Sequence, residues 1–408
     1  MLAKNPSALR APYSDALRNI MNVARAAECR QWLSAWRELC TGPTPLRRLQ
    51  GLARHLGIGR IDLKDESTRA TVGSFKALGA PVALARLILR QWPDRGWDPE
   101  ALFHGAYADA LSEFTVISAT DGNHGRSLAA AARSIGCRCV IVLHANVSEE
   151  RETPIAALGA KVVRIAGNYD ESVIEAARLA GENGWFVVSD TSYDGYEEIP
   201  RDVMQGYGVI AAEALEQQDG AVQPDSCPYT HIFLQGGVGG LAAGIVSYFC
   251  EAFGERRPTF IVVEPEQADC LYQSALRGHA SQATGSVDSV MAGLACGETS
   301  PLAWKFLHPS VDFFLTIRDD EAVDAMRTLA ASVNGDTPVL SGESGAAGLA
   351  GLVHLMAEPE LRRQAGLNAE STVLLINTEG ATAPAVYASL VGQTADAVLA
   401  AQARTMCA

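Results

Sequence analysis

Short apolar runs rich in β-branched residues alternate with longer segments of helical pattern in the first half of the chain. The runs lie at 115–119, 139–143, 161–165 and 185–188, and the helical segments between them end at Ser134 or span 149–158 and 170–182. This alternation is typical of parallel βαβ units. We therefore predict an α/β fold built on parallel strands.

The second half of the chain continues the pattern with fewer polar interruptions. Its apolar runs of strand length lie at 231–234, 259–263, 312–315 and 372–376. Near the N-terminus, helical patterning extends to about Arg37, and a strand is expected at 58–63. These runs extend the prediction of parallel strands over most of the chain.

Composition limits the class of protein. The chain has 408 residues, of which 48% are hydrophobic and 20% charged, which is the balance of a folded protein of about two domains. Its formal net charge of −14 argues against a nucleic-acid-binding surface. We find no apolar run of membrane-spanning length and no leading segment of secretory type.

The nine cysteines are scattered, with no C-x-x-C spacing and no neighbouring pair of histidines. This pattern disfavours a zinc site or a disulfide scaffold, and it suits the reducing cytoplasm. We therefore predict no metal site. Cys270 and Cys296 could become neighbours across a loop, but two free thiols are the favoured interpretation.

A lysine in apolar surroundings is the first candidate for chemistry. Lys76 follows Ser74 and Phe75 and precedes Ala77 and Leu78. A lysine amine is a nucleophile only when it is neutral, a state that desolvation or a nearby cation favours. On its own, an ordinary helix lysine remains the more common interpretation.

The second candidate is the loop Ser118–Gly125, between a predicted strand and an alanine-rich helix. Free N–H groups at a helix start, with Thr120 and Asn123 beside them, suit a carboxylate ligand. Asp121 is then either an N-cap or an acid–base group whose pKa the site has raised. His124 is expected to pack against the first helical turn, with catalysis as the alternative.

The third candidate, Gln235–Gly244, holds five glycines and opens a helix after a strand. Dense glycine lets the backbone approach a phosphate, and the helix dipole favours its charge. The spacing Gly237-x-Gly239-x-x-Ala242 also matches a dinucleotide fingerprint, with Glu264 placed where a ribose-binding acid would lie. A nicotinamide-dependent dehydrogenase is therefore an alternative.

The fourth candidate is Asn377–Gly380, after the last strong strand. Polar residues at the carboxyl end of a parallel strand face the ligand crevice of an α/β sheet. The hydroxyl of Thr378 could bond a ring nitrogen without protonating it, although a plain strand exit is an equal alternative. The turn Ser341–Gly345 is a weaker signal of the same kind.

Taken together and in this order, the four elements resemble the fold-type II pyridoxal-phosphate enzymes, which include threonine and serine dehydratases and tryptophan synthase β. Within that group the chain is most similar to the diaminopropionate ammonia-lyases. The stretches that carry this similarity are 64–69, 74–79, 120–125, 195–200, 204–207, 268–272, 291–298 and 377–380. Serine dehydratases carry serine where this chain has Asp121, and the lyases carry aspartate.

The resemblance implies pyridoxal 5′-phosphate as cofactor and α,β-elimination of 2,3-diaminopropionate to pyruvate and ammonia as reaction. Lys76 would hold the cofactor as a Schiff base and take the Cα proton, and Asp121 would act on the opposite enantiomer. The remaining implied cofactor contacts are Gly236, Gly237, Val238, Gly239 and Gly240 to the phosphate, Asn123 to the ring hydroxyl and Thr378 to the ring nitrogen. The implied substrate contacts are Ser74, Thr120, Asp121, Gly122, His124 and Asp190.

The resemblance also implies two open, twisted, mostly parallel sheets flanked by helices. Residues 1–83 and 200–408 would form a large cofactor-binding domain, and 84–199 a small domain with the carboxylate loop. A cytoplasmic homodimer is expected. Gly73 and Ala381 depart from the lyase pattern, which usually has Asn and Asp there. Another β-substituted amino acid as substrate, or a non-catalytic binding protein, therefore stays open as an alternative.

Overall fold

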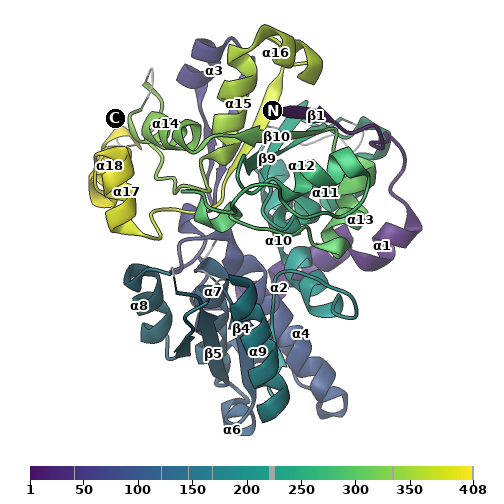
Figure 1. The fold of residues 1–408 in the computed structure, drawn as a ribbon, viewed down its shortest axis with the longest axis vertical. Helices are drawn as coiled ribbons and strands as arrows, with labels where there is room; N and C mark the ends of the chain where they lie inside the picture. The colour runs from purple at the N-terminus through teal and green to yellow at the C-terminus, as the bar shows by residue number, and fades with distance from the viewer. Residues whose placement is uncertain are drawn as a thin grey trace.

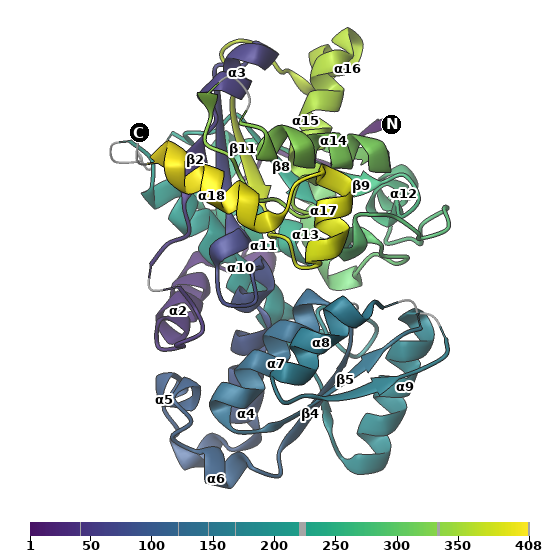
Figure 2. The ribbon, with the colours of Figure 1, turned by 90° about the vertical axis from the view of Figure 1, so that its left-hand side faces the viewer.

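The chain folds around two separate sheets, each covered by helices (Figures 1 and 2). The computed structural model describes residues 1–40, 42–120, 122–145, 147–167, 169–219, 226–332 and 335–406. In Figure 1 the larger sheet lies in the upper lobe and the smaller one in the lower lobe. The prediction of two mostly parallel sheets flanked by helices is confirmed.

The larger sheet has seven strands, and its five central strands are parallel. In spatial order the strands are β1 (Leu2–Lys4), β10 (Phe313–Ile317), β9 (Thr259–Pro265), β8 (His231–Gln235), β11 (Thr372–Asn377), β3 (Arg60–Asp65) and β2 (Leu46–Arg48). The short edge strands β1 and β2 run antiparallel to their neighbours. Every residue of β8 and β10 is buried, as expected for parallel strands covered on both faces.

The smaller sheet has four parallel strands. In spatial order they are β6 (Lys161–Arg164), β5 (Arg138–Leu143), β4 (Thr115–Ala119) and β7 (Phe186–Val187). Helices α7 (Asn123–Ile135) and α9 (Tyr169–Asn183) pack against it. Because parallel strands all end at one edge of their sheet, the loops that follow β4 and β7 leave the sheet at the same edge.

The remaining helices surround the two sheets. They are α1 (Asp15–Ile20), α2 (Val23–Ser34), α3 (Gln50–Leu56), α4 (Ala80–Gln91), α5 (Pro99–Phe103), α6 (Ala108–Leu111), α8 (Glu149–Ala157), α10 (Glu198–Glu216), α11 (Gly240–Phe253), α12 (Cys270–Arg277), α13 (Pro301–Ser310), α14 (Asp319–Ala330), α15 (Ala347–Ala357), α16 (Pro359–Ala365), α17 (Pro384–Val391) and α18 (Ala395–Met406).

Helix α10 lies centrally and packs against α2, α4 and α11. Glycines make this packing close: a Cβ on Gly206 would collide with the carbonyl of Leu78, and one on Gly244 would lie 2.5 Å from the carbonyl of Met204. The helix therefore contacts both the segment that carries Lys76 and the helix that follows the glycine-rich loop.

Candidate active site

Lys76 lies in a short 3₁₀ turn, η2 (Phe75–Leu78), laid against the end of β11. The Ser74 hydroxyl accepts from the backbone N–H of Lys76 at 3.4 Å and caps the turn. The N–H of Phe75 donates to the carbonyl of Thr378 at 3.0 Å, and the N–H of Gly380 donates to the carbonyl of Gly73 at 3.1 Å. The fold thus brings the first and fourth sequence candidates together, over 300 residues apart in the chain.

The Lys76 amine forms an ion pair with the carboxylate of Asp190, which follows β7. Only 20% of the lysine side chain and 17% of the aspartate side chain are exposed. Burial disfavours charge on both groups, but their mutual attraction outweighs it. The pKa of Lys76 is therefore raised and that of Asp190 lowered. In this state the lysine is a charged ammonium and no nucleophile.

His124 and Tyr196 fix the backbone that presents Asp190. The His124 ring places Nε2 2.8 Å from the carbonyl of Val188 and Nδ1 3.8 Å from the Asp190 carboxylate. Since a carbonyl only accepts, Nε2 carries the proton. The Tyr196 hydroxyl donates to the carbonyl of Val187 at 2.9 Å and accepts from the N–H of Ser189 at 3.0 Å. His124 is buried in the first turn of α7, where packing was expected.

The loop after β4 holds the carboxylate candidates. The Thr120 hydroxyl oxygen accepts from the N–H groups of Gly122 at 3.2 Å and Gly125 at 3.4 Å, so its own O–H stays available to donate. Asn123 begins α7 and donates its amide to the carboxylate of Glu379, the neighbour of Thr378. Asp121 lies outside the described residues.

The glycine-rich loop joins β8 to α11 and requires its glycines. Gly237 and Gly239 have φ of +61° and +100°, which other residues rarely adopt, and a Cβ on Gly236 would collide with Glu264. The loop leads to the N-terminus of α11, whose N–H groups and dipole favour an anion. A Cβ on Gly240 would lie 3.8 Å from the carbonyl of Asp190, so the loop borders the lysine–aspartate pair. Val238 accepts from the N–H of Ser300 through its carbonyl at 3.0 Å.

Glu264, the candidate ribose-binding acid, has another role. It is fully buried and accepts from the N–H groups of Leu271 at 3.0 Å and Tyr272 at 2.7 Å, at the start of α12. Burial raises the pKa of its carboxyl to about 8. Because this carboxyl is fully buried and accepts hydrogen bonds from the start of α12, it is not placed to bind a ribose.

The family comparison decides between the remaining alternatives. The family model described as "Pyridoxal-phosphate dependent enzyme" matches residues 38–379. The chain belongs to the pyridoxal-phosphate dependent enzymes. The predicted cofactor is thereby confirmed, and the dehydrogenase alternative falls together with the ribose role of Glu264.

Individual relatives within this family are similar over most of the chain. The diaminopropionate ammonia-lyase of Escherichia coli (strain K12) is 38% identical over 361 residues, covering 87% of this chain and 89% of the relative. That of Salmonella typhimurium (strain LT2) is 39% identical over 356 residues, covering 85% and 87%.

Solved structures agree with the fold. The holo diaminopropionate ammonia lyase from Escherichia coli matches with a TM-score of 0.85 and 34% identity, over 96% of both chains. Threonine deaminase isoform 2 from Solanum lycopersicum, at 20% identity and a TM-score of 0.73, shares the fold alone.

The residues present fit pyridoxal phosphate. The glycine-rich loop offers a cradle without side chains for a phosphate, and it borders a buried lysine. Thr378, only 2% exposed, brings a neutral hydroxyl to the same edge of the sheet. When bound, the cofactor supplies the electron sink for chemistry at the substrate Cα.

The two departures from the lyase pattern lie in different surroundings. Gly73 has φ of +69°, a left-handed conformation that glycine and asparagine both favour, so glycine replaces the family's asparagine without strain. A Cβ there would meet only the carbonyl of Ser67, at 3.6 Å. Ala381 is partly buried and packs against the hydrophobic core beneath β11.

Two glutamates at this edge were missed from the sequence. Glu379 accepts from Asn123 and from the N–H of Ser344 at 3.2 Å. Glu343 is buried beside it, and burial followed by repulsion from Glu379 raises the pKa of Glu343 to about 7. Both lie in stretches that the sequence marked, directly after Thr378 and within Ser341–Gly345, so adjacency to those candidates was the available signal.

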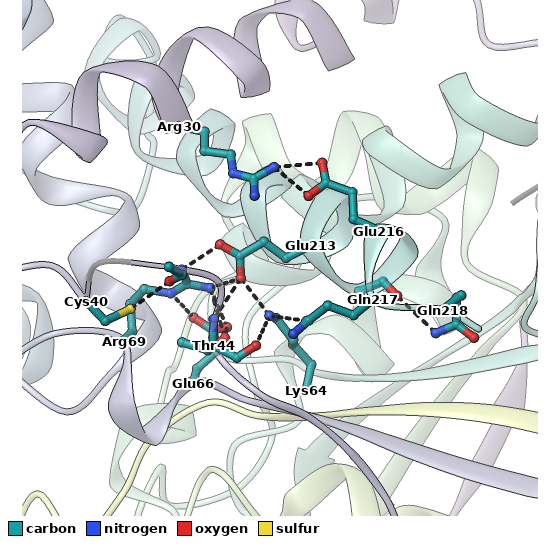
Figure 3. Close-up of polar contacts among 12 residues, drawn as sticks. Arg30, Cys40, Thr44, Lys64, Glu66, Arg69, Glu213, Glu216, Gln217 and Gln218 are labelled. Carbon is teal, nitrogen blue, oxygen red and sulfur yellow. Dashed lines mark hydrogen bonds and ion pairs between the residues drawn. The ribbon is translucent and has the colours of Figure 1, made fainter. Parts of the chain in front are cut away.

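A buried ionic network joins β3 and the turn that follows it to α10 (Figure 3). Arg69 donates to Glu66 at 2.7 Å and to both carboxylate oxygens of Glu213 at 2.8 and 2.7 Å. Lys64 donates to Glu213 at 2.6 Å and to the carbonyl of Thr44 at 2.5 Å. Two cations and two anions balance, and the network ties β3 and the segment leading to Lys76 to α10.

Three further findings concern the described residues. Over these ranges, no helix is both long and apolar enough to cross a membrane. Cys270 and Cys296 do not form a disulfide with each other. The described residues also hold no group of three or more His, Cys, Asp or Glu side chains that could bind a metal ion.

Proposed function

We propose that the chain eliminates ammonia from 2,3-diaminopropionate, giving pyruvate and two ammonia with uptake of one water. The observation that carries the proposal is the buried Lys76–Asp190 pair at the edge of the glycine-rich loop. Support comes from the relatives named as diaminopropionate ammonia-lyases, one of which has been solved with an aminoacrylate–pyridoxal phosphate reaction intermediate.

Each contact to the cofactor is proposed from position. Lys76 would hold the cofactor and, once released and neutral, take the proton from the substrate Cα. The backbone N–H groups from Gly236 to Gly240 would hold the phosphate. Asn123 would turn its amide to the ring hydroxyl, and Thr378 would offer its hydroxyl to the ring nitrogen.

The substrate would replace the lysine in the ion pair. Asp190 now pairs with an ammonium, and the distal ammonium of diaminopropionate is chemically equivalent to it. Thr120 has an O–H free to donate to the substrate carboxylate, and the backbone of Gly122 lies beside it. Ser74 and His124 border the same space from η2 and α7.

In one enantiomer of the substrate the Cα proton faces away from Lys76. We propose that Asp121 takes this proton. Asp121→Asn should then reduce turnover of one enantiomer much more than that of the other. Equal losses for both enantiomers would show a purely structural aspartate.

The decisive experiment compares two lysine variants of the purified protein. Lys76→Ala should abolish both the visible absorbance of the bound cofactor and ammonia release from diaminopropionate, because the covalent link and the base are lost together. Lys305→Ala removes an exposed lysine paired with Glu197 and should change neither. A coloured, active Lys76→Ala variant would overturn the assignment.

The same assay, run over a panel of β-substituted amino acids, tests the substrate. Diaminopropionate should give the highest kcat/KM. A β-hydroxy amino acid turned over faster would show a related lyase with another substrate. Binding of the cofactor without ammonia release from any amino acid would show a non-catalytic binding protein.

We also propose the organisation that the resemblance implied. Residues 84–199 would form a small domain, and 1–83 with 200–408 a large one. Two copies would associate as a cytoplasmic homodimer. A solution mass near 43.2 kDa would contradict the dimer, and recovery of the protein outside the cytoplasmic fraction would contradict the location.

A further inference from the structure

Tyr207 lies in the middle of α10 and packs against the turn that carries Lys76. It is 1% exposed. A Cβ on Gly79 would lie 2.8 to 2.9 Å from the Tyr207 ring, so the ring fills the space that glycine leaves open. Its centroid is also 4.8 Å from that of Phe75. The ring is therefore fixed by packing, and its hydroxyl has little freedom to move elsewhere.

The Tyr207 hydroxyl is buried without a hydrogen-bond partner among the described residues. Leaving a buried polar group unpaired costs free energy, so such a group calls for an explanation. Burial raises the pKa of the phenol, with Lys76 opposing and Asp190 reinforcing the shift. The hydroxyl thus stays protonated and is a potential donor that lacks an acceptor.

The candidate lysine lies against the same aromatic ring. Lys76 Nζ lies 5.3 Å from the centroid of the Phe75 ring, which Tyr207 contacts. The titratable groups that face this nitrogen are Asp190 after β7, Tyr207 on α10 and Cys296, with His124 on α7 behind Asp190. Lys76 and Tyr207 are thus neighbours across the Phe75 ring.

An ammonium has no lone pair and cannot accept a hydrogen bond, whereas a neutral lysine nitrogen has one. In the structure Asp190 holds the Lys76 ammonium beyond hydrogen-bond distance of the Tyr207 hydroxyl, since an ammonium within reach would donate to the phenol oxygen. We infer that Tyr207 is a positioning residue whose hydroxyl donates to the Lys76 nitrogen once that nitrogen is uncharged and has left Asp190. The inference rests on the proposed role of Lys76.

The consequence is a bias in favour of the reactive state. A hydrogen bond made only to the uncharged form stabilises that form and opposes protonation. Tyr207 would thereby offset part of the pull of Asp190 on the proton of Lys76. It would also hold the nitrogen in place when the substrate occupies Asp190.

The test compares Tyr207→Phe with Tyr387→Phe in the holoenzyme. Tyr387 is a matched control, because it too is fully buried with a hydroxyl that lacks a partner, but it packs in the other hydrophobic core. In Tyr207→Phe, the pH at which the visible absorbance of the cofactor changes should rise, together with the acidic limb of kcat. At neutral pH, kcat should fall about 3- to 10-fold with little change in KM, the size expected for one hydrogen bond. Tyr387→Phe should match the wild type in the pH of the absorbance change, the acidic limb of kcat and the value of kcat at neutral pH.

Thermal unfolding separates a positioning role from a structural one. Removing an unpaired buried hydroxyl should leave the Tm of both variants equal to or above that of the wild type. A lower Tm in Tyr207→Phe alone would show a structural hydroxyl, and titrations identical to those of Tyr387→Phe would also overturn the inference. Neither result would affect the assignment of Lys76, which Lys76→Ala tests separately.

Discussion

At the scale of single residues, the active-site edge is an arrangement of buried charges, some paired and some not. Lys76 and Asp190 neutralise each other, whereas Glu343 has the carboxylate of Glu379 as its neighbour. Burial alone would raise the pKa of both carboxyls, so the neighbouring charge decides the direction of each shift. The paired aspartate keeps a lowered pKa, and the glutamate beside another carboxylate has a pKa raised to about 7.

Glu343 should make the protein less stable as the pH rises. Its pKa is about 7 in the folded state against 4.5 in the unfolded state, so the unfolded chain releases this proton first. Stability from this group is complete below pH 4.5 and is lost between pH 4.5 and 7, by up to about 3 kcal/mol at about 1.4 kcal/mol per pKa unit. Glu343→Gln removes the titration, so its gain in free energy of unfolding over the wild type should be larger at pH 8 than at pH 4.5.

Urea titrations at the two pH values, with cofactor saturating, measure this difference. Glu197→Gln, at an exposed glutamate, serves as control and should change the free energy of unfolding by less than about 1 kcal/mol at either pH. A Glu343→Gln variant with the same pH dependence as the wild type would refute the raised pKa of Glu343 as the cause.

At the scale of elements, α10 connects the lysine turn, the glycine-rich loop and the buried ionic network. Gly206 in α10 allows close contact with η2, and Gly244 in α11 allows close contact with α10. Glu213, near its C-terminal end, binds Lys64 and Arg69 (Figure 3). The position of this helix therefore controls how the segment carrying Lys76 meets the glycine-rich loop.

Glu213→Gln should destabilise the protein by about 3–5 kcal/mol, because it leaves buried cations without their counter-charge. Glu216→Gln offers a control one turn further along the same helix. Its pair with Arg30 is exposed, so the loss should be below about 1 kcal/mol. Chemical unfolding of the two variants measures both values, and equal losses would show that the buried network adds nothing specific.

Most elements followed from the sequence, and the exceptions have a physical reason. The predicted strands 115–119 and 372–376 correspond to β4 and β11 within one residue, since buried parallel strands are continuous apolar runs. The edge strands β1 and β2 were not predicted. Each has three residues, mostly not buried, so neither leaves a pattern in its own sequence; β1 also pairs with the distant β10, whereas β2 pairs with β3, the next strand in the chain.

The residues of the candidate site also differ in how visible they are in the sequence. Lys76, the glycine-rich loop and Thr378 could be proposed from the sequence because each lies in a recognisable motif at a strand or helix end. Tyr207 was visible only as part of such a motif. Its position beneath Lys76 depends on how α10 packs across the chain, which local sequence does not encode.

At the scale of the whole molecule, the two sheets share one large hydrophobic core. This core contains Leu128 and Ile141 from the lobe of the smaller sheet and Phe249 and Phe260 from the lobe of the larger one. Helix α4 contacts both α7 and α10 within it. The lobes are therefore continuous in packing, although their sheets are separate.

Heat or urea should accordingly unfold the chain in one cooperative transition, with the same midpoint by near-ultraviolet and far-ultraviolet circular dichroism. Breaking the shared core in one lobe exposes apolar surface in the other, which couples the two. Two separated transitions, or a protease-resistant fragment covering 84–199, would contradict this expectation.

The ion pair of Lys76 with Asp190 has a further consequence for the chain before it receives its cofactor. A charged lysine does not add to carbonyl groups, so sugars and stray metabolic aldehydes that reach this pocket find no amine to react with. An aldehyde that carries a phosphate is different, because in the proposed site the glycine-rich loop would hold it beside the lysine at a high effective concentration. The small fraction of Lys76 that is uncharged is then sufficient for the amine to add to this aldehyde. The Lys76–Asp190 pair thus makes the lysine selective: aldehydes that carry a phosphate react with it, and other aldehydes do not.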